Sequence, residues 1–292
     1  MLAEALENGR ADLALRLGGA MWQFWYMRGH WSEGGRWLDS ALAAAGAKSD
    51  PQTRIDALDG AGILALWQGN LERAGAVADQ RLALAAEPDS GTFLFAGLVA
   101  DGHGNQDRAE QLYEESARLA RDQGDSVLLA MAVNNLGTVA VSRGDYERAL
   151  VLFEESLAIG REQRDQDRLA RASMNLGMTT LKLGDARRAR ELLRDSLVAA
   201  REIGLTEGFI GGFVGLGAAY AREDPARAAR LIGRADLLCE EAGLPRQLED
   251  PDRTQTEAEL RAQLGENAYA AAYAEGRALQ LEDALALALS PD

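Results

Sequence analysis

A Leu-Gly pair followed seven residues later by a Gly-Asp pair is the pattern that most constrains this chain. It occurs at Gly137, with Gly144 and Asp145 after it, and Ala149 and Phe153 then stand about one helical turn apart. A glycine lets two helices approach closely, and a Gly-Asp pair ends one helix and caps the next. The pattern therefore predicts a helical hairpin whose second helix turns Ala149 and Phe153 toward the first.

The hairpin pattern recurs, in steps of 40 residues with a single step of 35. Six repeats are readable, and their first-helix pairs are Met21-Trp22, Ala61-Gly62, Ala96-Gly97, Leu136-Gly137, Leu176-Gly177 and Leu216-Gly217. This order of residues resembles the tetratricopeptide signature, whose usual period is about 34 residues, so the longer step indicates longer helices. A single hairpin cannot bury its own apolar face, and such units stack into a solenoid with a concave groove.

We therefore predict an all-α fold, a tetratricopeptide-type α-solenoid in which about six hairpins form a right-handed superhelix with C-terminal capping helices. The solenoid is expected over residues 1–245, with repeats near 11–47, 52–87, 91–123, 126–163, 166–203 and 206–243. The cap is expected over 246–292, with helices near 253–264, 266–278 and 281–289. Close helix crossings are expected at Gly97, Gly137, Gly177 and Gly217.

The last hairpin would leave an apolar face in water unless the tail covers it. That face consists of Leu231, Ile232, Ala235 and Leu238. The expected covering residues are Tyr269, Tyr273, Leu279 and Leu281.

Charge and composition restrict the partners and the cellular compartment that we expect for this protein. The net charge of −15 disfavours direct binding of nucleic acid, because a surface of that sign repels phosphates. One cysteine, Cys239, excludes an internal disulfide and suits a reducing compartment, so we expect a cytoplasmic protein. No apolar run reaches the length of about 18 residues that a membrane span requires.

The residues needed for chemistry are not arranged in a recognisable site. The sequence has no phosphate-binding G-x-x-x-x-G-K-[ST] motif. Two histidines, His30 and His103, together with one cysteine do not make a familiar zinc site. We therefore expect a binding module with no cofactor and no metal rather than an enzyme, and an enzyme built on the solenoid is the less favoured alternative.

Aromatic residues crowd the first hairpin, which holds Trp22, Trp25, Tyr26, Trp31 and Trp37. Three of them, Trp22, Trp25 and Tyr26, follow helical spacing and favour a bulky core. An aromatic platform for a ligand or for a missing N-terminal domain is the alternative.

Three stretches resemble the tetratricopeptide region of large bacterial ATP-binding transcriptional regulators of the LuxR type. They are residues 15–42, the Gly-Asp-Tyr-Glu-Arg-Ala-Leu repeat, and the tail over 223–245 and 271–289. In those regulators an ATPase module precedes this region and a DNA-binding helix-turn-helix often follows it, and this sequence contains neither. The resemblance implies a sensor or protein-interaction role, in a fragment, a truncated relative or a stand-alone paralogue. A free-standing scaffold or chaperone-like adaptor is the alternative, and self-association is left open.

In tetratricopeptide hairpins the first helix of each repeat lines the groove. The expected partner-binding residues are Gln23, Tyr26, Met27, Trp67, Phe95, Asn134, Asn135, Thr138, Arg171, Asn175, Met178, Lys182 and Arg222. An amide at Asn135 or Asn175 can donate to and accept from a peptide backbone, and the basic residues can hold an acidic end. The partner is then a peptide or protein segment with apolar anchors. Pairing of these polar residues with nearby groups of the same chain is the alternative.

Overall fold

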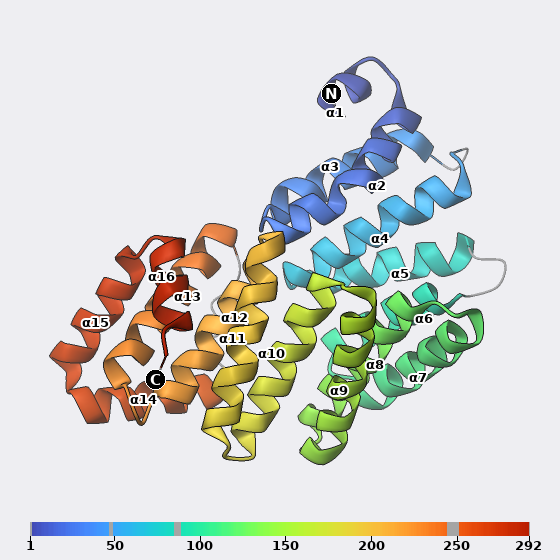
Figure 1. The fold of residues 1–292 in the computed structure, drawn as a ribbon. Helices are drawn as coiled ribbons and strands as arrows, with labels where there is room; N and C mark the ends of the chain where they lie inside the picture. The colour runs from blue at the N-terminus through green and yellow to red at the C-terminus, as the bar shows by residue number, and fades with distance from the viewer. Residues whose placement is uncertain (1, 47–48, 85–88, 244–250, 292) are drawn as a thin grey trace. The chain divides into compact units, whose positions relative to one another are not determined.

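The computed structural model describes residues 2–46, 49–84, 89–243 and 251–291. These residues form sixteen α-helices, and every regular element among them is helical (Figure 1). Two compact units are distinguished, the first ending at Val139 and the second beginning at Ala140, inside one helix. The expected ends of repeats at 47 and 87 and the expected boundary at 245/246 lie outside the described residues.

The first unit contains a short N-terminal helix, three complete hairpins and most of an eighth helix. The bounds are α1 Leu2–Glu7, α2 Ala11–Met27, α3 Trp31–Ala45, α4 Pro51–Trp67, α5 Leu71–Leu84, α6 Ser90–Gly102, α7 Gln106–Gln123 and α8 Ser126–Ser142.

The second unit contains the end of α8, the following helices of the repeats and the three tail helices. The bounds are α9 Tyr146–Gln163, α10 Gln166–Lys182, α11 Ala186–Ile203, α12 Thr206–Tyr220, α13 Pro225–Ala242, α14 Pro251–Leu264, α15 Glu266–Ala278 and α16 Leu281–Leu289. The bounds of α15 and α16 are those expected from the sequence, and α14 begins at Pro251 rather than near residue 253.

The Gly-Asp turns have the conformation that their sequence predicts. Gly144 and Gly184 adopt φ values of 77° and 89°, a left-handed region in which a side chain would be strained. The next residue then caps the following helix: the Asp145 carboxylate accepts a hydrogen bond from the backbone N–H of Arg148, at 3.2 Å. Each turn thus ends one helix and starts the next within three residues, which makes the hairpins tight.

Glycines inside the first helices mark close crossings with the second helices. A Cβ atom added to Gly97 would lie 2.5 Å from a ring carbon of α7. Added to Gly177 or Gly217, it would lie 2.8 Å from a side-chain carbon of α11 or α13. Real Cβ atoms are not found this close to another atom, so these three predicted crossings are confirmed and a larger residue would overpack each of them. The crossing at Gly137 stays a prediction.

Buried serines join the two helices of a hairpin in both units. The hydroxyl of Ser196 on α11 donates to the carbonyl of Ala170 on α10, at 2.7 Å. In the first unit the hydroxyl of Ser116 on α7 donates to the carbonyl of Ser90 on α6, at 2.9 Å. Each serine stands 26 residues after its acceptor, so the contact follows the repeat.

The tail packs on the last hairpin, with α15 along α13 (Figure 1). The two helices approach most closely at Gly233 and Gly276. A Cβ on Gly276 would lie 2.0 Å from the carbonyl oxygen of Arg230, and one on Gly233 would lie 2.2 Å from that of Tyr273. Leu231, Ile232, Ala235 and Leu238 of α13 are all core residues, as is Tyr269 of α15. Ile232 meets α12 at Gly217, so the covering of this whole face by the tail stays a prediction.

Candidate functional site

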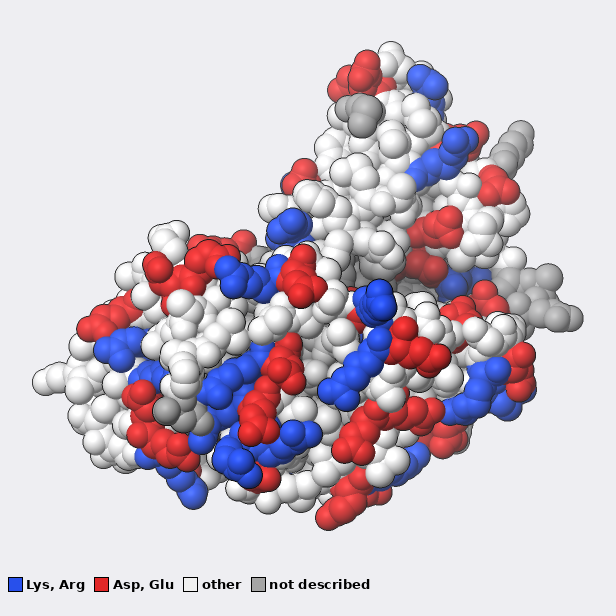
Figure 2. Space-filling view, in the orientation of Figure 1, with Lys and Arg blue, Asp and Glu red and all other residues white. Residues whose placement is uncertain are grey.

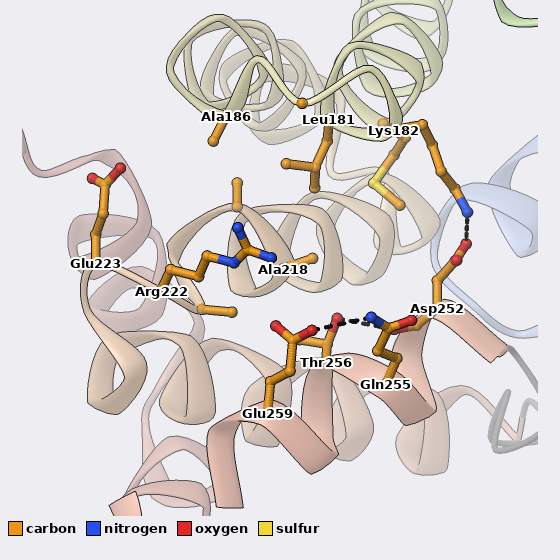
Figure 3. A pocket seen from close by; sticks show the side chains of 14 residues that line it. Leu181, Lys182, Ala186, Ala218, Arg222, Glu223, Asp252, Gln255, Thr256 and Glu259 are labelled. Atoms are coloured by element: carbon orange, nitrogen blue, oxygen red, sulfur yellow. Dashed lines mark hydrogen bonds and ion pairs between the residues drawn. The ribbon is translucent and has the colours of Figure 1, made fainter. Parts of the chain in front are cut away.

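A pocket of about 470 Å³ lies within the second unit, between the C-terminal turns of α10 and α12, the start of α11 and one face of α14 (Figure 3). Its floor is apolar and its rim carries charged and amide groups. The lining residues are Met178, Leu181, Lys182, Gly184, Ala186, Ala218, Ala219, Ala221, Arg222, Glu223, Asp252, Gln255, Thr256 and Glu259.

Two cationic side chains reach this pocket in different ways. Lys182, the last residue of α10, forms an ion pair with Asp252 at one end of the pocket. Arg222 follows the end of α12, is exposed, and extends into the space between α10 and α14 (Figure 3). Among the residues described, Arg222 has no hydrogen-bond or ion-pair partner. The pocket therefore offers one guanidinium whose donors are available to a ligand.

The polar wall of the pocket comes from α14. Asp252, Gln255, Thr256 and Glu259 stand at positions i, i+3, i+4 and i+7, so they share one face of that helix. The Gln255 amide donates to the carboxylate of Glu259, at 3.1 Å, and the Thr256 hydroxyl donates to the carbonyl of Asp252, at 2.9 Å. This face thus presents both hydrogen-bond donors and acceptors to the pocket.

The opposite face of α14 is held by buried charges. Arg253 pairs with Asp236 of α13, with 2.6 Å between Nη2 and Oδ1, and donates to Glu257, at 3.1 Å. The Tyr273 hydroxyl of α15 donates to the second oxygen of Asp236, at 2.6 Å. Burial lowers the pKa of Arg253, but hydrogen bonds and charge attraction from Asp236 and Glu257 outweigh it, so the net shift of this pKa is upward. Arg253 stays cationic, and α14 is fixed against α13 and α15.

A further contact ties α14 to the end of α12. The Gln263 amide donates to the carbonyl of Ala221, at 3.0 Å, and this carbonyl belongs to the C-cap of α12. The last carbonyl groups of a helix have no hydrogen-bond donor within that helix. Here a side-chain donor satisfies one of them. The pocket is therefore bounded by helices that are joined to one another.

Of the residues predicted from the second unit, the structure brings Met178, Lys182 and Arg222 together in the pocket. Arg171 lies outside the lining and is engaged by acids of its own unit, at 3.0 Å from Asp167 and 2.8 Å from Glu207. For Arg171 and Lys182, pairing within the chain was the alternative that the sequence left open. Asn175 is half-buried on α10 and does not line the pocket.

The residues predicted from the first two hairpins lie around an aromatic group. Tyr26, Met27 and Trp67 are half-buried and Gln23 is exposed. The ring of Trp67 lies 5.8 Å from that of Tyr26 and 6.0 Å from that of Trp31. These distances are typical of aromatic packing, so Tyr26 and Trp67 are held by ring contacts while part of each stays accessible.

Other aromatic residues of the first hairpin form its core. Trp25 and Trp31 are 4% and 1% exposed, and the indole N–H of Trp31 donates to the carbonyl of Tyr26, at 2.8 Å. Trp22 and Trp37 are half-buried. Of the three residues on which the core interpretation rested, Trp25 is buried while Trp22 and Tyr26 are half-buried.

Phe95 is not a groove residue, and this correction has a simple physical cause. Its side chain is 4% exposed. The ring fills the space left by the absent side chain of Gly62 on α4, where an added Cβ would lie 2.2 Å from Cζ. A large apolar ring that meets such a gap is more stable buried than in water.

The amide and hydroxyl residues of α8 are half-buried. They are Asn134, Asn135 and Thr138, and the Thr138 hydroxyl donates to the carbonyl of Asn135, at 2.7 Å. All three belong to the first unit, and Asn175 belongs to the second.

The wall supplied by α14 was not predicted. Its polar residues at helical spacing look, in sequence, like an ordinary solvated face. No signal in the sequence distinguishes a solvated helix face from a face that lines a pocket, because the difference depends on which helix packs opposite α14. In the residues that the structure describes, no group of His, Cys, Asp and Glu is arranged to hold a metal ion, and no helix is long and apolar enough to cross a membrane.

Comparison with known proteins agrees with this architecture. Residues 126–202 match the tetratricopeptide repeat family, and residues 92–140 match the family of anaphase-promoting complex subunit 5. The fold is a tetratricopeptide-type α-solenoid. Among curated proteins, none matches this sequence.

Solved structures share this tetratricopeptide-type fold at low sequence identity. Rap protein complexed with competence and sporulation factor is 16% identical, with a TM-score of 0.70 over 95% of this chain and 76% of that one. NprR in complex with its cognate peptide NprX is 16% identical, with a TM-score of 0.58 over 94% and 80%. A signal transduction ATPase with a tetratricopeptide repeat sensor from Pyrococcus horikoshii is 14% identical, with a TM-score of 0.55 over 98% of this chain and 44% of that one.

Proposed function

We propose that this chain is a non-catalytic protein-interaction module that binds a peptide or protein segment, and that the pocket of the second unit is one place where it does so. The observation that carries the proposal is the exposed Arg222 side chain, which extends into a pocket with an apolar floor (Figure 3). A guanidinium forms strong, geometrically specific hydrogen bonds with a carboxylate. The pocket thus suits a segment that combines an apolar side chain with an acidic group.

Each part of such a segment has a counterpart in the pocket. Met178, Leu181 and Ala218 offer apolar surface to its side chain. Gln255 and Thr256 of α14 can donate to or accept from its backbone. Ligand sites of this kind are mostly apolar with a few placed polar groups, and a volume of about 470 Å³ accommodates one or two side chains rather than a folded domain.

Similar structures support the peptide-binding role. Rap protein and NprR were each solved with a peptide or factor bound, and both share the fold of this chain. The ATPase from Pyrococcus horikoshii carries its tetratricopeptide repeats as a sensor. We propose by analogy that this chain is the ligand-sensing part of a bacterial transcriptional regulator of the LuxR type, with a stand-alone scaffold or adaptor as the second candidate. A cytoplasmic location fits both.

The pocket can be tested with two pools of short peptides that share apolar residues. One pool carries Asp or Glu near its C-terminus and the other carries Asn or Gln at the same positions, and binding is read by fluorescence anisotropy. We expect the purified chain to bind the acidic pool more tightly. The Arg222→Ala variant should lose about 1.5–3 kcal/mol of that binding, the contribution of a hydrogen bond to a charged group.

The matched control is Arg187→Ala. Arg187 lies on α11, and its side chain is 81% exposed; within the described part of the chain its charged partner is Glu191, at the long distance of 4.0 Å. The Arg187→Ala variant removes the same charge from the same unit but outside the pocket, so it should leave the affinity for the acidic peptides unchanged. Equal losses in both variants would mean that general charge, not the pocket, attracts the peptide, and no binding of either pool would refute the proposal.

A further inference from the structure

We infer that Asp252 of α14 is a built-in competitor for the acidic group of the ligand, because it occupies Lys182 when the pocket is empty. This inference rests on the proposed function and adds a regulation of that same site. Lys182 and Asp252 lie at one end of the pocket, 70 residues apart in sequence, and they pair directly (Figure 3). A ligand carboxylate that reaches this end meets a lysine that is already paired.

The exchange of partners requires little free energy. The Lys182 and Asp252 side chains are 32% and 55% exposed, so water and ions reach both. Exposed ion pairs of this kind stabilise a protein only slightly, because each charge is well solvated without the other. A ligand carboxylate held nearby by Arg222 can therefore displace Asp252 without disturbing the fold.

The helices themselves stabilise the two charges when the pair is open. Lys182 is in the last turn of α10, where the helix dipole favours a cation, and Asp252 is in the first turn of α14, where it favours an anion. Each residue thus keeps a favourable local environment after the exchange.

The pair is not needed to hold α14 in place. On its other face α14 is fixed by the buried contact between Arg253 and Asp236, and nearer its C-terminal end the Gln263 amide holds it to the end of α12. Removing the exposed contact should leave the wall of the pocket intact. Asp252 at the rim therefore affects the affinity for the ligand rather than the stability of the fold.

A substitution at Asp252 should strengthen binding of the ligand rather than weaken it. Asp252→Asn removes the competing charge and leaves Lys182 available, so the acidic peptide pool should bind about two- to fivefold more tightly. The Asn/Gln pool should not gain. Lys182→Ala should weaken binding of the acidic pool, and the gain from Asp252→Asn should disappear in the double variant.

Asp283→Asn is the matched control. Asp283 is an exposed aspartate in the first turn of α16, in the same unit but outside the pocket, so this variant makes the same change in net charge. It should leave the affinity unchanged, and thermal unfolding should show that all variants fold. If the acidic pool binds but Asp252→Asn binds no more tightly than the wild type or Asp283→Asn, the competition is refuted while the proposed function stands. If neither pool binds any variant, the proposed function fails and the competition falls with it.

Discussion

Asp236 and Arg253 form an ion pair inside the second unit, with their side chains 0% and 5% exposed and 2.6 Å between Oδ1 and Nη2. The pair joins α13 to α14, and the Tyr273 hydroxyl of α15 completes it at the second carboxylate oxygen, at 2.6 Å. Three helices thus meet at one buried carboxylate. Because charges without partners are costly in such a place, this cluster determines where α14 lies and hence how the pocket is closed.

Removing one partner of this pair should be strongly destabilising. Arg253→Ala leaves the carboxylate of Asp236 buried without the guanidinium that pairs with it, and we expect a loss of about 3–5 kcal/mol in the free energy of unfolding. Denaturant unfolding followed by circular dichroism measures it. Arg230→Ala serves as control, because Arg230 joins the same region through an exposed pair with Glu275, at 2.8 Å, and should cost about 1 kcal/mol or less. Similar losses for both variants would mean that the buried ion pair contributes no more to stability than the exposed one.

A side chain at Gly276 should push the tail off the last hairpin. The Cβ of Gly276→Ala would lie 2.0 Å from a backbone carbonyl oxygen of α13, which cannot move aside as a flexible side chain can. We expect a loss of about 1–3 kcal/mol and concentration-dependent association through the uncovered apolar face. Thermal unfolding and light scattering measure these effects.

Gly75→Ala is the matched control for that substitution. Gly75 also lies inside a helix, α5, but a Cβ there meets no atom of the described residues within 4 Å. An alanine should therefore be neutral or stabilise by about 0.5–1 kcal/mol, because glycine loses more entropy in a helix. If Gly276→Ala behaved like Gly75→Ala, the close approach of α13 and α15 would be contradicted.

Asp59 should make the stability of the first unit depend on pH. Burial raises the pKa of Asp59 to about 6, although Arg81 lies 2.7 Å away and opposes the shift, while Asp56 and Asp89 add to it. The folded chain then keeps this proton at pH values where the unfolded chain, with a pKa near 3.8, has lost it. The stability contributed by the protonated form is therefore present below pH about 4 and is lost as the pH rises through about 6.

The measurement is the difference in unfolding free energy between the wild type and Asp59→Asn across that range. The substitution cannot titrate, so the wild type should lose stability relative to the variant as the pH rises from 4 to 7. Asp79→Asn, at an exposed aspartate on α5, is the control for the loss of one carboxylate. A constant difference for Asp59→Asn would show that its carboxyl titrates alike in the folded and unfolded chain.

The chain by itself should bind no DNA above background at moderate salt and should hydrolyse no ATP. Its net charge is −15, and on the face drawn in Figure 2 its Lys and Arg side chains are interspersed with Asp and Glu. A phosphate backbone requires a concentration of positive charge. Gel-shift and phosphate-release assays measure both activities, and sequence-selective, salt-resistant DNA binding would contradict this expectation.

The helices and turns of this protein were largely determined by local sequence. The Gly-Asp turns and the bounds of α15 and α16 follow from residues within about one turn of each other. The glycines at three helix crossings follow instead from the repeat pattern, because each meets a side chain 15 or 16 residues further along the chain. Helical hydrogen bonds join residues four apart and caps join residues three apart, so the necessary information is local. Because the pattern repeats mostly every 40 residues, the structure predicted for one hairpin applies to the others.

Only the tertiary structure decided which side chains are exposed and available to a ligand. Phe95 carries the same apolar signal as a groove residue, but the missing side chain of Gly62 on another helix gives it a buried place. Asp252 and Asp236 are both acidic helix residues in sequence, yet one is exposed at the rim of the pocket and the other is completely buried. Their difference arises from contacts with residues 70 and 17 positions away. Burial and pairing of a polar group depend on what folds against it, and no local pattern contains that information.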